Sequence, residues 1–145
     1  MLALATTFCI SVPASGQVPD TVFVEELTWT EIRDEINAGK TTIILGTGGT
    51  EQNGPHMVMG KHNLIMNYTA EQIARKLGTA LVAPVIAYVP EGNLEPPTNH
   101  MRFPGTITLP EEPYRKLLEY AARSFKVNGS KTSCLLATAE ATSRA

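Results

Sequence analysis

Residues 41–51 read Thr-Thr-Ile-Ile-Leu-Gly-Thr-Gly-Gly-Thr-Glu, and this stretch decides the class of fold. Thr41 to Leu45 form an uninterrupted run of β-branched and apolar residues, which is typical of a strand buried on both faces. The glycines that follow at 46, 48 and 49 predict a sharp loop. A strand of this kind needs helices on both faces of its sheet, so the stretch indicates an α/β protein.

The sequence on either side alternates between helical and extended patterns. These patterns predict three helices and two further strands: helices over 29–38, over 63–77 and from Pro113 to a stop at Gly129, and strands over 80–89 and 132–137. Helix followed by strand, three times in succession, predicts a three-layer sandwich with a mainly parallel sheet.

Two helix starts and one long loop have specific signals. Thr28 followed by Glu31 fits a capping box, in which the two residues satisfy each other's backbone N–H groups. Asn63 is the predicted cap of the second helix. The proline-rich loop over 90–105 is long enough to form the lid or wall of a site.

The first 17 residues differ from the rest of the chain. Met1 to Pro13 is apolar and uncharged, and the small residues at 14–16 follow it. This pattern resembles a secretory signal peptide, so residues 18–145 are the expected mature domain, exported to the periplasm and not membrane-bound after processing. A buried N-terminal strand or helix is the alternative.

Composition excludes some classes of protein. A net charge of −2 shows no basic surplus, which argues against a nucleic-acid partner. The two cysteines, Cys9 and Cys134, are too few for a disulfide framework or a cysteine-based metal site. Cys134 lies in an apolar run and is expected to be buried.

Polar and ionisable side chains are concentrated in the segment after the first strand, where ligands bind in open α/β sheets. The segment from Glu51 to Asn63 contains a carboxylate, carboxamides, a lysine and two of the three histidines. Such oxygen and imidazole donors suit Zn, Mn or another divalent metal. A phosphate cradle and a serine hydrolase are disfavoured, because GxGxxG, GK[ST] and GxSxG are all missing. For His56, beside Pro55, a structural role in the loop is the alternative.

Three motifs carry a resemblance to a known family. Residues 50–56, Thr-Glu-Gln-Asn-Gly-Pro-His, resemble the signature of the creatininase family, in which a strand-end glutamate precedes a histidine by two positions and Gly-Pro-His follows. Residues 100–109, His-Met-Arg-Phe-Pro-Gly-Thr-Ile-Thr-Leu, resemble a second signature with a Phe-Pro-Gly-Thr core. Residues 27–32 match the usual opening helix. The resemblance covers roughly residues 27–129.

The resemblance implies a metal-dependent hydrolase acting on a cyclic amide or a related ring compound. Family members hold a metal pair with two glutamates, two histidines and a bridging aspartate. Glu51 matches the first glutamate, whereas Asn53 replaces a histidine and His62 replaces the aspartate. A carboxamide is a weak ligand and a neutral imidazole does not readily bridge two cations. We therefore expect one Zn, Mn or Fe ion rather than two, held by Glu51, His62 and Asn53.

The same resemblance assigns the remaining roles. The metal would polarise a ring carbonyl and activate a water molecule. Gln52 and His56 are expected to support the loop or contact the small-molecule substrate. His100 is expected to serve in catalysis by orienting substrate or transferring a proton, with packing in the loop as the alternative. Homo-oligomerisation is implied by resemblance alone.

The sequence departs from the family pattern in two ways. The substituted ligands indicate a divergent branch, with an oxidised sugar or inositol as a possible substrate. The family's Gly-His motif is missing after residues 132–137, and Glu140 is not assigned as a ligand. The fold is therefore expected to be incomplete and C-terminally truncated, and the alternative function is a catalytically inactive family fragment.

Overall fold

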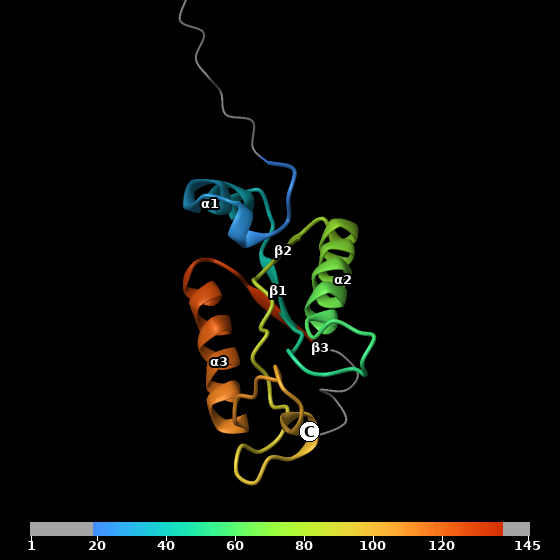
Figure 1. Ribbon diagram of the computed structural model, residues 1–145. Coiled ribbons are helices and arrows are strands. Elements are labelled where there is room, and N and C mark those ends of the chain that lie inside the picture. The colour runs from blue at the N-terminus through green and yellow to red at the C-terminus, as the bar shows by residue number, and fades with distance from the viewer. Residues whose placement is uncertain (1–18, 138–145) are drawn as a thin grey trace, which may run out of the picture.

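A parallel sheet of three strands, in the order β2-β1-β3, forms the centre of the computed structural model, which describes residues 19–137. The strands are β1 (Thr42–Thr47), β2 (Ala80–Val82) and β3 (Thr132–Ala137). Figure 1 shows them side by side between the helices. The predicted signal peptide and Glu140 lie outside the described residues.

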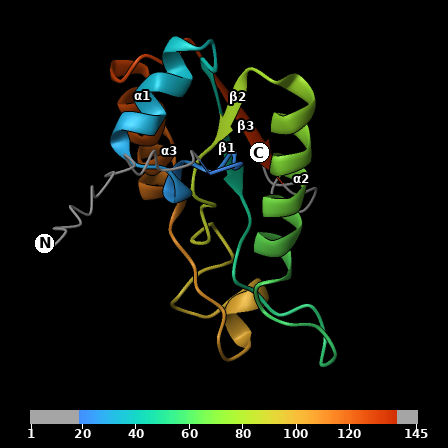
Figure 2. The ribbon, with the colours of Figure 1, turned by 90° about the horizontal axis from the view of Figure 1, so that it is seen from above.

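Three helices cover the two faces of this sheet. Helix α2 (Lys61–Leu77) lies on one face, and α1 (Trp29–Asn37) and α3 (Glu111–Val127) lie on the other, as Figures 1 and 2 show. Two short 3-10 helices, Val24–Glu26 and Asn99–Arg102, complete the elements of the described residues. The predicted α/β three-layer sandwich with a parallel sheet is confirmed.

Adjacent residues of β1 explain the three layers. Ile44 belongs to a buried cluster with alanines of α2, and Ile43 belongs to a second buried cluster that α1 and α3 cover. Both isoleucines are 1% exposed. Because successive side chains of a strand point to opposite faces, an apolar run without alternation buries both faces.

The start of α1 contains the predicted capping box. The Glu31 backbone N–H donates to Thr28 Oγ1 at 3.4 Å, and the Thr28 N–H donates to Glu31 Oε2 at 2.7 Å. The Thr28 N–H and the Thr28 hydroxyl, which donates to the same Oε2 at 2.7 Å, lower the pKa of the Glu31 carboxyl, because they favour its charged form.

The predicted cap of α2 is wrong. The helix begins at Lys61, two residues before Asn63, and Gly60 is its cap. The Asn63 side chain instead reaches across to the glycine loop, where its Oδ1 accepts from the Gly49 N–H at 3.0 Å. The Asn63 side chain therefore bonds a backbone N–H far away in the sequence instead of a backbone N–H of its own helix. The helix ends as predicted at Gly78, in left-handed backbone with φ +68°.

The predicted strand over 80–89 is regular only over Ala80–Val82. Pro84 has no backbone N–H to donate to a neighbouring strand, so regular strand pairing stops before it. The chain nevertheless stays beside β1, since the Ile86 N–H donates to Gly46 O at 2.9 Å and the Gly48 N–H donates to Ile86 O at 3.0 Å. This alignment brings the following loop to the carboxyl end of β1.

Strand β3 has the predicted bounds but lies at the edge of the sheet. Nearly all of its side chains are exposed, and Cys134, which was expected to be buried, is exposed with them. Helix α3 likewise has no buried residue. Among the described residues, no helix has the length and apolarity needed to cross a membrane.

Candidate metal centre

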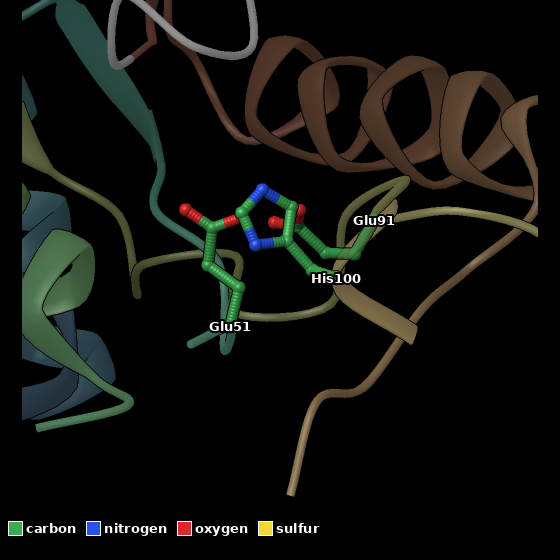
Figure 3. A group of neighbouring side chains, drawn as sticks. All are labelled: Glu51, Glu91 and His100. Atoms are coloured by element: carbon green, nitrogen blue, oxygen red, sulfur yellow. The ribbon is translucent and has the colours of Figure 1, made fainter. Parts of the chain in front are cut away.

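Two carboxylates and an imidazole meet beyond the carboxyl end of β1. Glu51 lies in the loop after β1, and Glu91 and His100 lie in the loop between β2 and α3. One potential ligand atom from each of the three lies within 4.8 Å of the other two. Figure 3 shows both carboxylates turned toward the His100 ring. These three side chains are called the ligand group below.

The ligand group is largely removed from solvent. Glu51 is 2% exposed and Glu91 is 5% exposed, whereas the His100 side chain keeps 22% of its surface. Two neighbouring buried carboxylates lose their hydration and repel each other, so they stay ionised only with positive charge nearby. A divalent cation within the ligand group would supply that charge.

His100 presents Nε2 to Glu51 and holds Nδ1 against the backbone. Nε2 lies 3.2 Å from Glu51 Oε2, while Nδ1 lies 3.2 Å from the carbonyl oxygen of Gln52 and 3.4 Å from its side-chain Nε2. When Nδ1–H donates to the carbonyl, Nε2 keeps a lone pair facing a carboxylate, as in a metal-bound histidine. When Nδ1 accepts from the amide, Nε2–H donates to Glu51.

The spacing between these two donors also suits a metal ion. Donors about 2.1 Å from a tetrahedral ion lie roughly 3.4 Å from each other. The observed separation of His100 Nε2 and Glu51 Oε2 is 3.2 Å. The three residues therefore fit a divalent metal in donor chemistry, and the pair formed by His100 Nε2 and Glu51 Oε2 also fits it in spacing.

His62, a predicted ligand, lies in the first turn of α2 and is 6% exposed. Its Nδ1 lies 3.0 Å from Glu51 Oε1, so His62 and His100 contact different oxygens of the same carboxylate. The structure thus places His62 as a contact of Glu51, beside the ligand group. Contacts of this kind fix the orientation of a metal-binding carboxylate.

Asn53, the other predicted ligand, has its carboxamide engaged within the loop. Its Oδ1 accepts from Lys61 Nζ at 2.6 Å, and its Nδ2 donates to the backbone oxygen of Glu51 at 3.3 Å. The oxygen that would bind a metal thus already accepts from an ammonium group.

Gln52 and His56, the predicted substrate contacts, differ in position. Gln52 Oε1 accepts from the Gly54 N–H at 2.9 Å, and its Nε2 faces His100, so the side chain braces the loop. His56 is exposed on the turn that follows. Of these two residues, Gln52 adjoins the ligand group.

Sequence reasoning missed Glu91. This glutamate stands next to Pro90, at the start of a loop that was expected to form a wall of the site. The His100 N–H donates to Glu91 O at 3.2 Å, which folds the loop back and brings the two side chains together. A carboxylate at the carboxyl end of a strand-like segment was the available signal.

The fold and the ligand group define an α/β protein with a buried carboxylate–imidazole centre at the carboxyl end of its parallel sheet. The family model of creatininase, described as creatinine amidohydrolase, matches residues 25–138. The chain therefore belongs to the creatininase family, as the three motifs indicated.

Two curated relatives are similar to this chain in sequence. Creatinine amidohydrolase of Pseudomonas putida is 37% identical over 89 residues, which are 61% of this chain and 33% of the relative. The 3-dehydro-scyllo-inosose hydrolase of Thermotoga maritima is 27% identical over 119 residues, which are 81% of this chain and 36% of the relative. The chain spans about a third of the length of each of these relatives.

Solved structures agree with the family and the fold. A crystal structure of creatinine amidohydrolase superposes with a TM-score of 0.69 at 29% identity, covering 81% of this chain and 44% of that one. A Zn-Zn type variant of creatininase gives 0.69 at 29% identity, covering 81% and 45%. A manganese form of creatininase gives 0.68 at 30% identity, covering 79% and 44%.

Proposed function

We propose that this chain carries part of the metal centre of a creatininase-family hydrolase, with Glu51, Glu91 and His100 as the ligands of one divalent ion. The observation that carries the proposal is the approach of His100 Nε2 and Glu51 Oε2 to 3.2 Å, with Glu91 within reach of both. A metal bound there would polarise a carbonyl of the substrate and favour ionisation of water.

The side chains around the ligand group have supporting roles. His62 holds Glu51 through Oε1, and a hydrogen bond from His100 Nδ1–H to the Gln52 carbonyl would favour the tautomer that leaves Nε2 available to a metal. His100 is therefore assigned to the metal rather than to proton transfer, because its Nε2 faces a carboxylate. His56, on the exposed turn, remains a candidate substrate contact.

One ion rather than two is favoured by the position of Lys61. A relative is described as Zn-Zn type, but here the ammonium of Lys61 lies 2.6 Å from Asn53 Oδ1. A positive charge at that distance opposes a second cation on the same oxygen. The proposed centre thus holds a single Zn, Mn or Fe ion.

The names of the two relatives support a proposal about the substrate class. One acts on creatinine and the other on 3-dehydro-scyllo-inosose, and both are compact, oxygen-bearing rings. We propose a small ring compound with a carbonyl group as the substrate of this chain. Ring opening of creatinine and of a keto-inositol, followed by chromatography, tests which ring is used.

Metal binding is the decisive experiment. The chelator-treated chain is titrated with Zn or Mn in competition with a chromophoric chelator, and elemental analysis gives the stoichiometry. We expect one ion per chain, and Glu51→Gln, Glu91→Gln and His100→Gln should each weaken binding more than tenfold.

Glu95→Gln is the matched control, because Glu95 is exposed in the same loop as Glu91. This variant should bind metal like the wild type. The proposal fails if the folded chain binds no metal, or if Glu91→Gln and Glu95→Gln bind it equally well. Binding without hydrolysis of either ring would instead support the alternative of an inactive fragment.

A further inference from the structure

We propose that Thr108 is a positioning residue that sets Glu91 in the ligand group. This inference rests on the proposed metal centre and adds a residue that makes no contact with the metal itself. It concerns the second half of the segment 100–109, whose role in the site was not evident from its sequence.

The Thr108 hydroxyl uses both of its hydrogen-bonding capacities on the backbone around Glu91. It accepts from the Glu91 N–H at 2.9 Å and donates to the Gly92 carbonyl at 3.0 Å. The Thr108 side chain thus holds both the peptide group that precedes Glu91 and the peptide group that follows Gly92. Since Glu91 lies between them, its Cα and the direction of its side chain are fixed.

Thr108 is itself held by two strand-like bridges. The Leu109 N–H donates to Val89 O at 3.1 Å, and the Ile107 N–H donates to Thr50 O at 3.0 Å. Val89 and Thr50 are close in sequence to Glu91 and Glu51, respectively. The segment 107–109 therefore links the two chain segments that present the two carboxylates.

Gly49 restricts the far end of the Glu91 side chain. A Cβ atom placed on Gly49 would lie 2.7 Å from Glu91 Oε1, so the carboxylate packs directly on the glycine backbone. Thr108 fixes the backbone of Glu91 and Gly49 bounds its carboxylate. With both ends constrained, Glu91 can be held within the small tolerance that a metal ligand allows.

The hydroxyl of Thr108 can be removed with little change of shape. Thr108→Val loses both hydrogen bonds, whereas Thr108→Ser keeps the hydroxyl and loses only a methyl group. We expect Thr108→Val to weaken Zn binding about 10- to 100-fold, the range for loss of an outer-shell partner, and Thr108→Ser to restore most of it. The Glu91 amide should exchange with deuterium faster in Thr108→Val than in Thr108→Ser.

Thr98→Val is the matched control. The Thr98 hydroxyl accepts from the Asn93 N–H at 2.8 Å, so it also braces the loop after Glu91, but it does not bond the Glu91 peptide. Its loss should leave Zn affinity near that of the wild type. If Thr108→Val does not fold, Thr108→Ala removes the same hydrogen bonds with less bulk and takes its place.

The outcomes separate the two proposals. If the wild type binds Zn through Glu51, Glu91 and His100 but Thr108→Val binds it equally well, the positioning role is refuted while the metal centre stands. Equal losses in Thr108→Val, Thr108→Ser and Thr98→Val would also refute it, because they would indicate only general weakening of the loop. If the folded wild type binds no metal, both proposals fail.

Discussion

Gly49→Ala should weaken metal binding by displacing Glu91, and the displacement can be worked out from the structure. The added Cβ would lie 2.7 Å from Glu91 Oε1, whereas such contacts essentially never fall below 3.0 Å and rarely below 3.4 Å. The carboxylate must therefore move by 0.3 to 0.7 Å, the differences between these limits and 2.7 Å. Metal–ligand distances tolerate about 0.2 Å.

The expected loss of affinity is at least about tenfold, or roughly 1.4 kcal/mol. Displacing a direct ligand should cost no less than losing an outer-shell partner, which typically costs about 10- to 100-fold. Gly49 also has φ +130°, so alanine adds backbone strain of about 1–3 kcal/mol to the folded state. Affinity is measured by chelator competition and stability by urea unfolding of the metal-free chain.

Gly54→Ala separates displacement from strain. Gly54 lies in the same loop with φ +83°, but a Cβ placed on it would meet nothing within 4 Å. We expect Gly54→Ala to lose stability comparable to Gly49→Ala while keeping its affinity for Zn. Equal affinities of Gly49→Ala and Gly54→Ala would show that Glu91 does not bind the metal, or that it adjusts without cost.

Two further predictions concern the fold. Because the pKa of Glu31 is lowered on folding, its contribution to stability is present above its ordinary value of 4.5 and is lost as the pH falls through the lower, folded value. Urea unfolding should thus show Glu31→Gln less stable than the wild type at pH 7 and equal to it in strong acid; a difference independent of pH would refute this. Cys134, exposed on β3, should react with a thiol reagent in the native Cys9→Ser variant. Protection until denaturation would show that the edge of β3 is covered in solution.

Local patterns predicted the parts of the fold that depend on near neighbours. Thr28 and Glu31 are three residues apart, and their capping box needs no information from elsewhere in the chain. The burial of Ile43 and Ile44 follows from the strand period alone. The errors arose where distant residues intervene: Asn63 bonds Gly49 across the loop instead of capping its own helix.

The residues of the candidate site likewise differ in how far the sequence predicts them. Glu51 was predicted because it matches the first glutamate of the family signature, in the loop after a strand whose burial is evident from the sequence. Glu91 was missed because its place beside Glu51 depends on Pro84, on the continued alignment at Ile86 and on the turn that returns at His100. No spacing between residues 51 and 91 encodes that alignment. Side chains brought together by backbone pairing are therefore the least predictable part of this centre.

The structure gives a physical reason for the segment after Phe103-Pro-Gly. A metal centre assembled from two loops has no helix or strand to set the distance between its carboxylates. Here residues 107–109 provide that element, because their backbone pairs with Thr50 on one side and Val89 on the other. The threonine at 108 then extends this pairing to Glu91 through its side chain. Residues 107–109 of the second motif thus link the chain segments that carry Glu51 and Glu91, the two carboxylates of the proposed centre.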